Sequence, residues 1–435
     1  MAERPNILFI CTDQQFAGAM SCAGNNELHT PGMDRLADRG IRFDHAYCTY
    51  PVCIPSRESL LTGRMPWELG YREWGDGIDS RFEGQQMGFH FREAGYDTVY
   101  GGKLHAPEED PEAYGFRRIS PWDDRVLADD CIQYLREDRE EPFLMVASFD
   151  NPHNICEWAR NENLPWGNIP DRATKDCPNL PPNFAIPPFE PEVIRWIQNR
   201  APTFYPTVNY SPEDWRHYRN AYFRLIEKVD HEIERILDTL EQTGLQENTI
   251  VVFTSDHGDG HGAHQWNQKS LLYEESVRIP LIVSWPGRLR EGGVDREHLV
   301  SNGLDLMPTF CDFAGIRPPD GLPGLSLRPL LESGTARWRD GLFIEAWPFQ
   351  GDPGNTPGRA LITAEYKYAV YRWGRYREQL FDRKADPGEM VNLAVNDRYF
   401  TILDHHRERL REYCDGMADP FCSAIPRGHP EPGRP

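Results

Sequence analysis

The sequence has no long uninterrupted hydrophobic run, and 39% of its 435 residues are hydrophobic. A membrane-spanning helix needs about 20 consecutive apolar residues, so this absence excludes a membrane span. The first five residues lead straight into an apolar stretch, without the basic region, long apolar core and small-residue cleavage site of a signal peptide. We therefore expect a cytoplasmic protein with no membrane partner.

Closely spaced cysteines and positive charge are also scarce. The ten cysteines are scattered without C-x-x-C spacing, which argues against a zinc ribbon and does not demand disulfides. The 47 basic residues face 68 acidic ones, and the net charge of −21 argues against nucleic acid as a partner. Any site for an anion must therefore be made positive locally, by a cation or by Lys, Arg and His side chains.

Several short apolar runs are each followed by polar residues, the pattern of buried parallel strands that deliver side chains at their carboxyl ends. They cover residues 6–11, 41–47, 98–102, 143–149 and 249–254. Helical patterns lie between them at 31–39 and from the N-cap Ser211 to Gly244. This alternation predicts an open α/β sheet whose site lies beyond its carboxyl edge.

The length predicts a large domain and a smaller one. We assign residues 1–339 to a catalytic α/β domain, in which the proline- and aromatic-rich excursion at 154–210 either lines the substrate pocket or is a packed surface segment. Antiparallel strand patterns at 342–347, 360–363 and 366–371 and a helix at 400–413 predict a C-terminal α+β subdomain over 340–424. The tail at 425–435 is expected to be disordered.

The most informative segment runs from Cys53 to Arg64 and reads CIPSRESLLTGR. Pro55 suits the first turn of a helix, which places Cys53 just before a helix N-terminus. Unpaired backbone N–H groups there attract an anion, and Arg57 adds donors that can hold an oxyanion. The alternative is that Cys53 is a buried free cysteine.

This segment resembles the C-x-P-S-R-x-x-x-L-x-G-R signature of type I, formylglycine-dependent sulfatases in the alkaline phosphatase-like superfamily. The resemblance implies that a formylglycine-generating enzyme oxidises Cys53 to formylglycine. One hydroxyl of the hydrated aldehyde attacks the sulfur of a sulfate ester, and the other later expels the sulfate. It also implies a large, mainly parallel sheet flanked by helices, with a smaller C-terminal antiparallel sheet plus helix.

Asp13 and Gln14 end one predicted strand, and Asp256 and His257 end another. Oxygen ligands with one imidazole fit a hard or borderline divalent cation. The resemblance implies that these four residues bind a metal, with an oxygen of the modified Cys53 completing the shell. The Gln and His pairing is similar to that of choline sulfatases and phosphonate monoester hydrolases, so Ca²⁺ and Mn²⁺ are both candidates.

The resemblance extends to further residues that surround the sulfate. Lys103 and His105 match a K-x-H element, which implies that Lys103 holds the diol and the sulfate and that His105 takes a proton as sulfate leaves. His153 and Lys269 match residues beside the leaving oxygen. We also expect three residues to contact the substrate, namely His264, Trp347 and Arg359.

These patterns favour a sulfatase acting on a sulfated saccharide or a small organic sulfate. One alternative is a phosphonate monoester or phosphodiester hydrolase, although those enzymes replace the pair formed here by Lys103 and His105. Another is a sulfate-ester-binding protein in which Cys53 stays a thiol and no turnover occurs.

Overall fold

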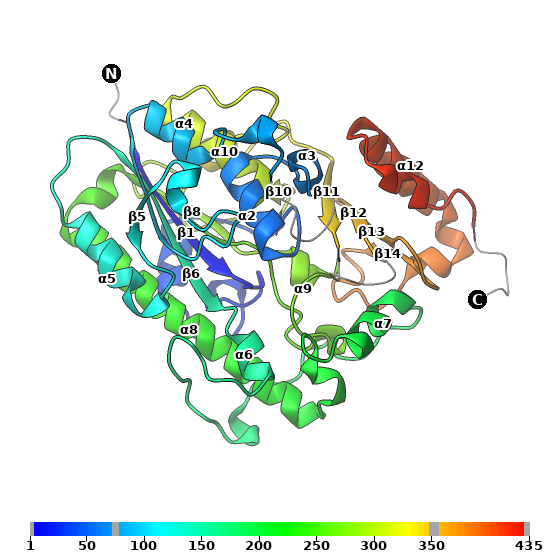
Figure 1. Cartoon of the computed structure of the whole chain (residues 1–435). Helices are drawn as coiled ribbons and strands as arrows, with labels where there is room; N and C mark the ends of the chain where they lie inside the picture. Colours follow the sequence, from blue (N-terminus) through cyan, green and yellow to red (C-terminus); the bar gives the residue numbers. More distant parts are fainter. Residues whose placement is uncertain (1–3, 72–77, 348–355, 430–435) are drawn as a thin grey trace.

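An eight-stranded sheet lies at the centre of the computed structural model, which describes residues 4–71, 78–347 and 356–429 (Figure 1). Its strand order is β5-β4-β6-β1-β7-β8-β2-β9. Only β8 runs antiparallel to its neighbours, so the sheet is mainly parallel, as the sequence predicts. The strands are β1 (Asn6–Asp13), β2 (Gly40–Phe43), β4 (Asp97–Gly102), β5 (Arg117–Ser120), β6 (Phe143–Pro152), β7 (Thr249–Ser255), β8 (Leu281–Ser284) and β9 (Gly293–Asp295).

Strand β1 is buried along its whole length because helices cover both faces of the sheet. Its side chains alternate between two hydrophobic cores: Ile7 and Phe9 enter one, whereas Leu8 and Ile10 enter the other. Because successive residues of a strand point to opposite faces, a continuous apolar run is what a doubly covered strand requires.

Figure 1 shows α5 and α8 on one face of the sheet and α2, α4 and α10 on the other. The long helix α8 begins with a capping box between Ser211 and Asp214, and Pro212 occupies its first position. The helices are α1 (Pro31–Asp38), α2 (Cys53–Thr62), α3 (Pro66–Leu69), α4 (Met87–Glu93), α5 (Asp124–Leu135), α6 (Ile155–Ala159), α7 (Glu192–Arg200), α8 (Pro212–Gln242), α9 (Glu274–Val277), α10 (Asn302–Ala314), α11 (Arg328–Ser333) and α12 (Phe400–Gly416).

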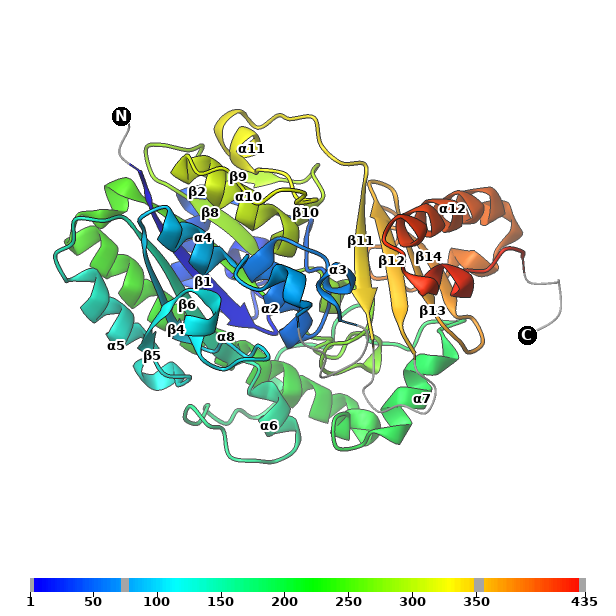
Figure 2. The ribbon, with the colours of Figure 1, turned by 45° about the horizontal axis from the view of Figure 1, so that its top comes forward.

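A four-stranded antiparallel sheet forms the C-terminal part, and α12 packs against it (Figure 2). Its strands are β11 (Gly341–Ala346), β12 (Gly358–Thr363), β13 (Tyr366–Tyr371) and β14 (Glu378–Asp382). The fold class predicted from the sequence is therefore confirmed. The domain boundary at residues 339 and 340 stays a prediction, although β11 begins close to it.

Two local predictions are wrong. The predicted strand at 41–47 is split, because the chain turns after β2 and then forms β3 (Ala46–Tyr47), which pairs with β10 (Val300–Ser301) in a separate small sheet. The tail is not disordered from its start: Ile425 is buried in the C-terminal core and His429 stacks on Phe400 at 4.0 Å. Residues 430–435 lie outside the described part.

Across the described ranges, no helix combines the length and the apolar character that crossing a membrane demands. The cytoplasmic location stays a prediction.

Candidate active site

The parallel strands β4, β6, β1 and β7 end side by side, and each is followed by polar residues at the same edge of the sheet. Asp13 closes β1, Lys103 follows β4, Asp150 lies near the end of β6, and Asp256 follows β7. Helix α2 begins at this edge with Cys53 as its first residue, one position further into the helix than the sequence predicts. The topology thus brings together residues that are far apart in the chain.

Three of these side chains and that of His257 form a compact cluster that fits a divalent cation. Asp13, Cys53, Asp256 and His257 are all buried, and each offers a donor atom within 4.8 Å of the others. The Sγ atom of Cys53 lies 3.6 Å from Asp13 Oδ1 and 3.3 Å from His257 Nε2, and His257 Nε2 lies 3.7 Å from an oxygen of each aspartate. Ligands at right angles around an ion at roughly 2.3–2.6 Å are about 3.3–3.7 Å apart.

The tautomer of His257 suits this role. Its Nδ1 lies 3.0 Å from the carbonyl oxygen of Gly258 and donates to it, which leaves the lone pair of Nε2 facing the cluster. Gln14 lies at the same edge in a left-handed conformation with φ of 72°. Its amide nitrogen donates to Asp259 at 2.7 Å, and its amide oxygen, which lies 3.8 Å from the thiol sulfur of Cys156, keeps a lone pair for a cation.

Two ammonium groups make the cluster locally positive. Lys103 Nζ lies 2.6 Å from Asp13 Oδ2, and Lys269 Nζ donates to Cys53 Sγ at 2.9 Å. Burial alone would raise the pKa of Cys53, but Lys269 and Lys103 hold it well below its usual range. Burial also opposes ionisation of Asp13, yet Lys103 and His153 keep its pKa below the ordinary value. An anionic group is therefore stabilised here despite the net charge of −21.

Arg57 lies beneath the carboxylates. Its guanidinium donates to Asp256 at 2.8 Å and to Asp13 at 3.2 Å, and also to the carbonyl oxygen of Lys103 at 2.7 Å. The sequence suggests that these donors hold an oxyanion. In the structure the guanidinium of Arg57 instead donates to the carboxylates of Asp13 and Asp256, so it positions two of the proposed metal ligands.

The K-x-H element faces the cluster, together with an aromatic residue that the sequence does not single out. His105 contributes to lowering the pKa of the Cys53 thiol, and its ring centroid lies 5.4 Å from that of Trp122. Trp122 also covers Lys103, with Nζ 4.9 Å from the ring centroid, and it is 38% exposed. No sequence signal points to Trp122, because it belongs to the irregular connection between β5 and α5.

Asp150 links the proline-rich excursion to the cluster. One of its oxygens accepts from Lys103 Nζ at 2.9 Å, and the other accepts from the indole of Trp166 at 2.7 Å. His153 lies on the same turn, and its backbone N–H donates to the carbonyl of Asp150 at 3.0 Å. Asp150 is not singled out from the sequence, although its position at the end of a buried strand is the kind of signal that could have indicated it.

The described contacts do not join the three residues expected to contact the substrate to the Cys53 cluster. Arg359 is buried and ion-paired with Asp419 at 2.7 Å, because β12 places it against the segment that follows α12. His264 is buried and stacks on Tyr273 at 4.0 Å. Trp347 is half-buried directly after β11. The substrate contact of all three residues stays a prediction.

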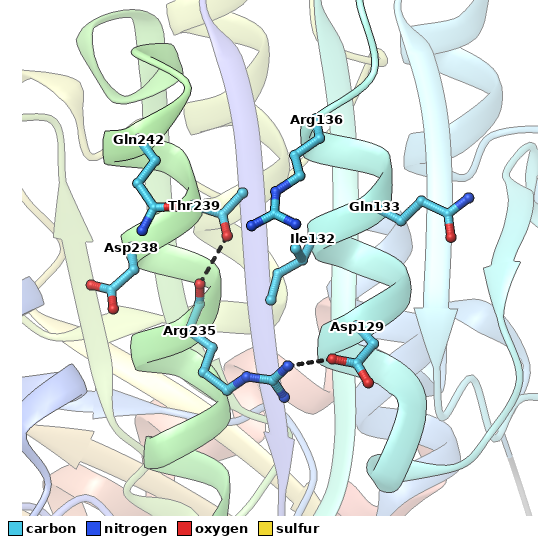
Figure 3. A pocket seen from close by; sticks show the side chains of 8 residues that line it. All are labelled: Asp129, Ile132, Gln133, Arg136, Arg235, Asp238, Thr239 and Gln242. Carbon is cyan, nitrogen blue, oxygen red and sulfur yellow. Dashed lines mark hydrogen bonds and ion pairs between the residues drawn. The ribbon is translucent and has the colours of Figure 1, made fainter.

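A groove of about 540 Å³ lies between α5 and α8 (Figure 3). Figure 3 shows Arg235 of α8 paired with Asp129 of α5 across it. It adjoins the end of α5 that leads into β6, and so lies away from the carboxyl edge of the sheet. This hollow is therefore separate from the candidate active site.

Comparison with known proteins identifies relatives over nearly the whole chain. The profile of the family described as Sulfatase matches residues 5–316, and that of the C-terminal region of N-sulphoglucosamine sulphohydrolase matches 262–415. A Delta 4,5-hexuronate-2-O-sulfatase of Bacteroides thetaiotaomicron is 32% identical over 97% of this chain and 91% of its own length. An N-acetylglucosamine-6-O-sulfatase of the same organism is 28% identical, over 96% of this chain and 88% of its own.

Solved structures agree with these matches. A 2-O GAG sulfatase superposes with a TM-score of 0.85 and 29% identity, over 97% of this chain and 94% of that one. The phosphonate monoester hydrolase of Agrobacterium radiobacter has a TM-score of 0.77 at 22% identity, over 95% and 96% of the two chains, and at that identity it shares the fold alone.

Proposed function

This chain belongs to the sulfatase family and hydrolyses sulfate monoesters, and we propose that its natural substrate is a sulfated saccharide. The observation that carries the chemistry is the place of Cys53. Its sulfur lies at the start of α2, within the cluster of Asp13, Asp256 and His257, and 2.9 Å from Lys269 Nζ.

We propose that Cys53 is converted to formylglycine by a maturing enzyme. The hydrated aldehyde then supplies the nucleophile and lets sulfate leave by collapse to the carbonyl. The sulfur of Cys53 stands where a hydroxyl oxygen of that group would lie. His105, which lowers the pKa of the Cys53 thiol, would take the proton of the second hydroxyl as sulfate leaves.

A divalent cation held by Asp13, Gln14, Asp256 and His257 would supply Lewis-acid chemistry to the sulfate oxygens. The spacing of the donor atoms suits Ca²⁺ better than Mg²⁺, because ligands at roughly 2.0–2.1 Å would lie only about 3 Å apart. Mn²⁺ stays an alternative, since an imidazole is among the ligands.

Two lysine side chains are proposed to contact the sulfate group directly. Lys103 and Lys269 flank the sulfur of Cys53 and the carboxylate of Asp13, so their ammonium groups can neutralise charge on the transferred sulfate. His153 and Lys269 are placed to protonate or stabilise the leaving oxygen.

The saccharide assignment is supported by two observations. The relatives described above are named as a hexuronate-2-O-sulfatase and an N-acetylglucosamine-6-O-sulfatase. In this chain the exposed ring of Trp122 borders Lys103 and His105, where it can pack against the face of a sugar whose sulfate lies on the cluster.

Replacing Trp122 with alanine is expected to raise KM for a sulfated disaccharide about 3- to 10-fold, because the sugar loses an aromatic contact. Turnover of ethyl sulfate, which has no ring, should change much less. Sulfate release measured by ion chromatography gives both values. Trp122→Phe keeps a ring and should retain most of the affinity, and an equal loss on both substrates would mean that Trp122 only supports Lys103.

The proposed function is tested on chain whose Cys53 peptide has been weighed by mass spectrometry. Converted enzyme should release sulfate from a 2-O-sulfated unsaturated hexuronate or from N-acetylglucosamine-6-sulfate faster than from an aryl sulfate. It should also hydrolyse the aryl sulfate faster than an aryl phosphonate. A preference for the phosphonate would establish the alternative hydrolase, and a Cys53 that stays a thiol in its native host would favour the non-catalytic binding protein.

A further inference from the structure

A second buried cluster lies apart from the active site, at the junction with the C-terminal subdomain. His264 comes from the segment after β7, Glu275 from α9, and Glu389 from the loop after β14. Each offers a donor atom within 4.8 Å of the others, and all three residues are buried. The cluster shares no residue with the Cys53 site.

Glu275 carries a buried oxygen that lacks a donor. Its Oε1 accepts from the amide of Asn183 at 2.8 Å, whereas its Oε2 has no hydrogen-bond partner among the described residues. The nearest imidazole atom, His264 Nε2, lies 3.8 Å from Oε2, which is too long for a hydrogen bond. The side chain of Glu275 is only 9% exposed and that of His264 only 1%, so water has little access to this oxygen.

The neighbouring cations are engaged by other carboxylates. Lys367 Nζ lies 2.8 Å from Glu389 and 3.2 Å from Glu274, and Arg278 pairs with Glu274 at 3.1 Å. The charge of Glu275 is therefore not matched by a nearby ammonium or guanidinium group of its own. A buried carboxylate without a counter-charge is costly, and burial accordingly raises the pKa of Glu275, so the site favours either a proton or a positive ligand on this oxygen.

The imidazole of His264 is prepared to be a neutral ligand. Burial lowers its pKa to about 3, and the nearby Arg195 acts in the same direction. Tyr273 stacks on the ring of His264 with a centroid separation of 4.0 Å. The backbone N–H of His264 donates to the carbonyl oxygen of Asn183 at 2.7 Å. The Nε2 atom makes a long contact of 3.4 Å with the amide nitrogen of Asn183, which also donates to Glu275 at 2.8 Å and to the carbonyl oxygen of Gly388 at 3.1 Å. A cation would replace this long contact at Nε2.

We propose that His264, Glu275 and Glu389 bind a second divalent cation. The separation of 3.8 Å between Nε2 and Oε2 resembles the separations of 3.3–3.7 Å in the Cys53 cluster, where donor atoms also face one another across a gap. One imidazole and two carboxylates suit a borderline ion such as Mn²⁺ or Zn²⁺. The ion would fasten the loop that carries Lys269 to the C-terminal subdomain.

The test uses crystals of the full chain grown with MnCl₂ and, separately, with ZnCl₂. Anomalous diffraction should show a peak between His264, Glu275 and Glu389 with at least one of the two metals, in addition to a peak at the Cys53 cluster. Elemental analysis of dialysed protein should give two ions per chain. Glu275→Gln, which keeps size and shape, should lose one ion and the corresponding peak.

The matched control is Glu378→Gln, which removes the same charge from a carboxylate that pairs with Arg407 at 2.5 Å. It should keep both ions. The proposal is overturned if neither metal gives a peak at His264 in the wild-type crystal, whether or not the Glu275 variant folds. A peak that survives Glu275→Gln would also overturn the assigned ligand set.

Discussion

Cys53→Ala is expected to lower kcat for sulfate ester hydrolysis by about 10⁴-fold or more. The loss is this large because the nucleophile itself is removed, and deleting a nucleophile in other hydrolases has comparable cost. Lys103, Lys269 and the proposed metal ligands stay in place, so the variant should still bind the substrate. Initial rates by ion chromatography and substrate affinity by calorimetry measure the two effects separately.

The control for this variant is Cys131→Ala. Cys131 is a buried cysteine of α5 that packs in the core between the helices and the sheet. Its replacement removes the same atom and should cost some stability while leaving kcat unchanged. A Cys53→Ala enzyme with a tenth of the original rate would place the nucleophile at another residue.

The second large effect is expected from Asp13→Asn. Asp13 contacts Lys103 at 2.6 Å, Arg57 at 3.2 Å and His257 at 3.7 Å. Its negative charge therefore contributes to the proposed metal site and also neutralises the buried side chains of Lys103 and Arg57. We expect kcat to fall about 10³-fold or more, since the Lewis-acid contribution is worth several kcal/mol. Metal content should fall in parallel, as measured by elemental analysis.

The free energy of unfolding should fall as well, by less than the roughly 3–5 kcal/mol typical of breaking a buried ion pair. The loss is smaller because Asp150 still pairs with Lys103 and Asp256 still pairs with Arg57. Asp305→Asn provides a comparison. Asp305 is fully buried and pairs with Arg339 at 2.5 Å in another part of the fold. Urea unfolding should show a loss for both variants, whereas only Asp13→Asn should lose metal and turnover. Full metal occupancy in Asp13→Asn would contradict its role as a ligand.

The sheet and the centre of the site could be predicted because they depend on local pattern. A continuous apolar run that ends in polar residues describes β1 and β7, and parallel strands bring their ends to one edge. Asp13 and Asp256 were therefore predicted as neighbours from the strand ends. The motif around Cys53 added the third part of the cluster.

The residues at the rim could not be placed in this way. Trp122 lies in an irregular connection, and only the tertiary fold brings it to Lys103. Arg359 looked available for substrate, but its partner Asp419 is 60 residues further along the chain and no periodic pattern reveals that pairing. His264 follows the same rule, since its neighbour Glu389 belongs to the other subdomain.

The contacts of Asp150 constrain how new specificities can arise in this architecture. Since the carboxylate holds Lys103 with one oxygen and the indole of Trp166 with the other, the loop that would shape the recognition surface also sets the aim of an ammonium group in the reaction centre. The oxygen that accepts from Trp166 also accepts from Asn154 at 2.8 Å, so a loop transplanted from a relative that lacks a donor at the position of Trp166 would leave Asp150 with one of these two hydrogen bonds. Such a loop, chosen to change substrate selectivity, would also shift Lys103 and lower the rate of hydrolysis.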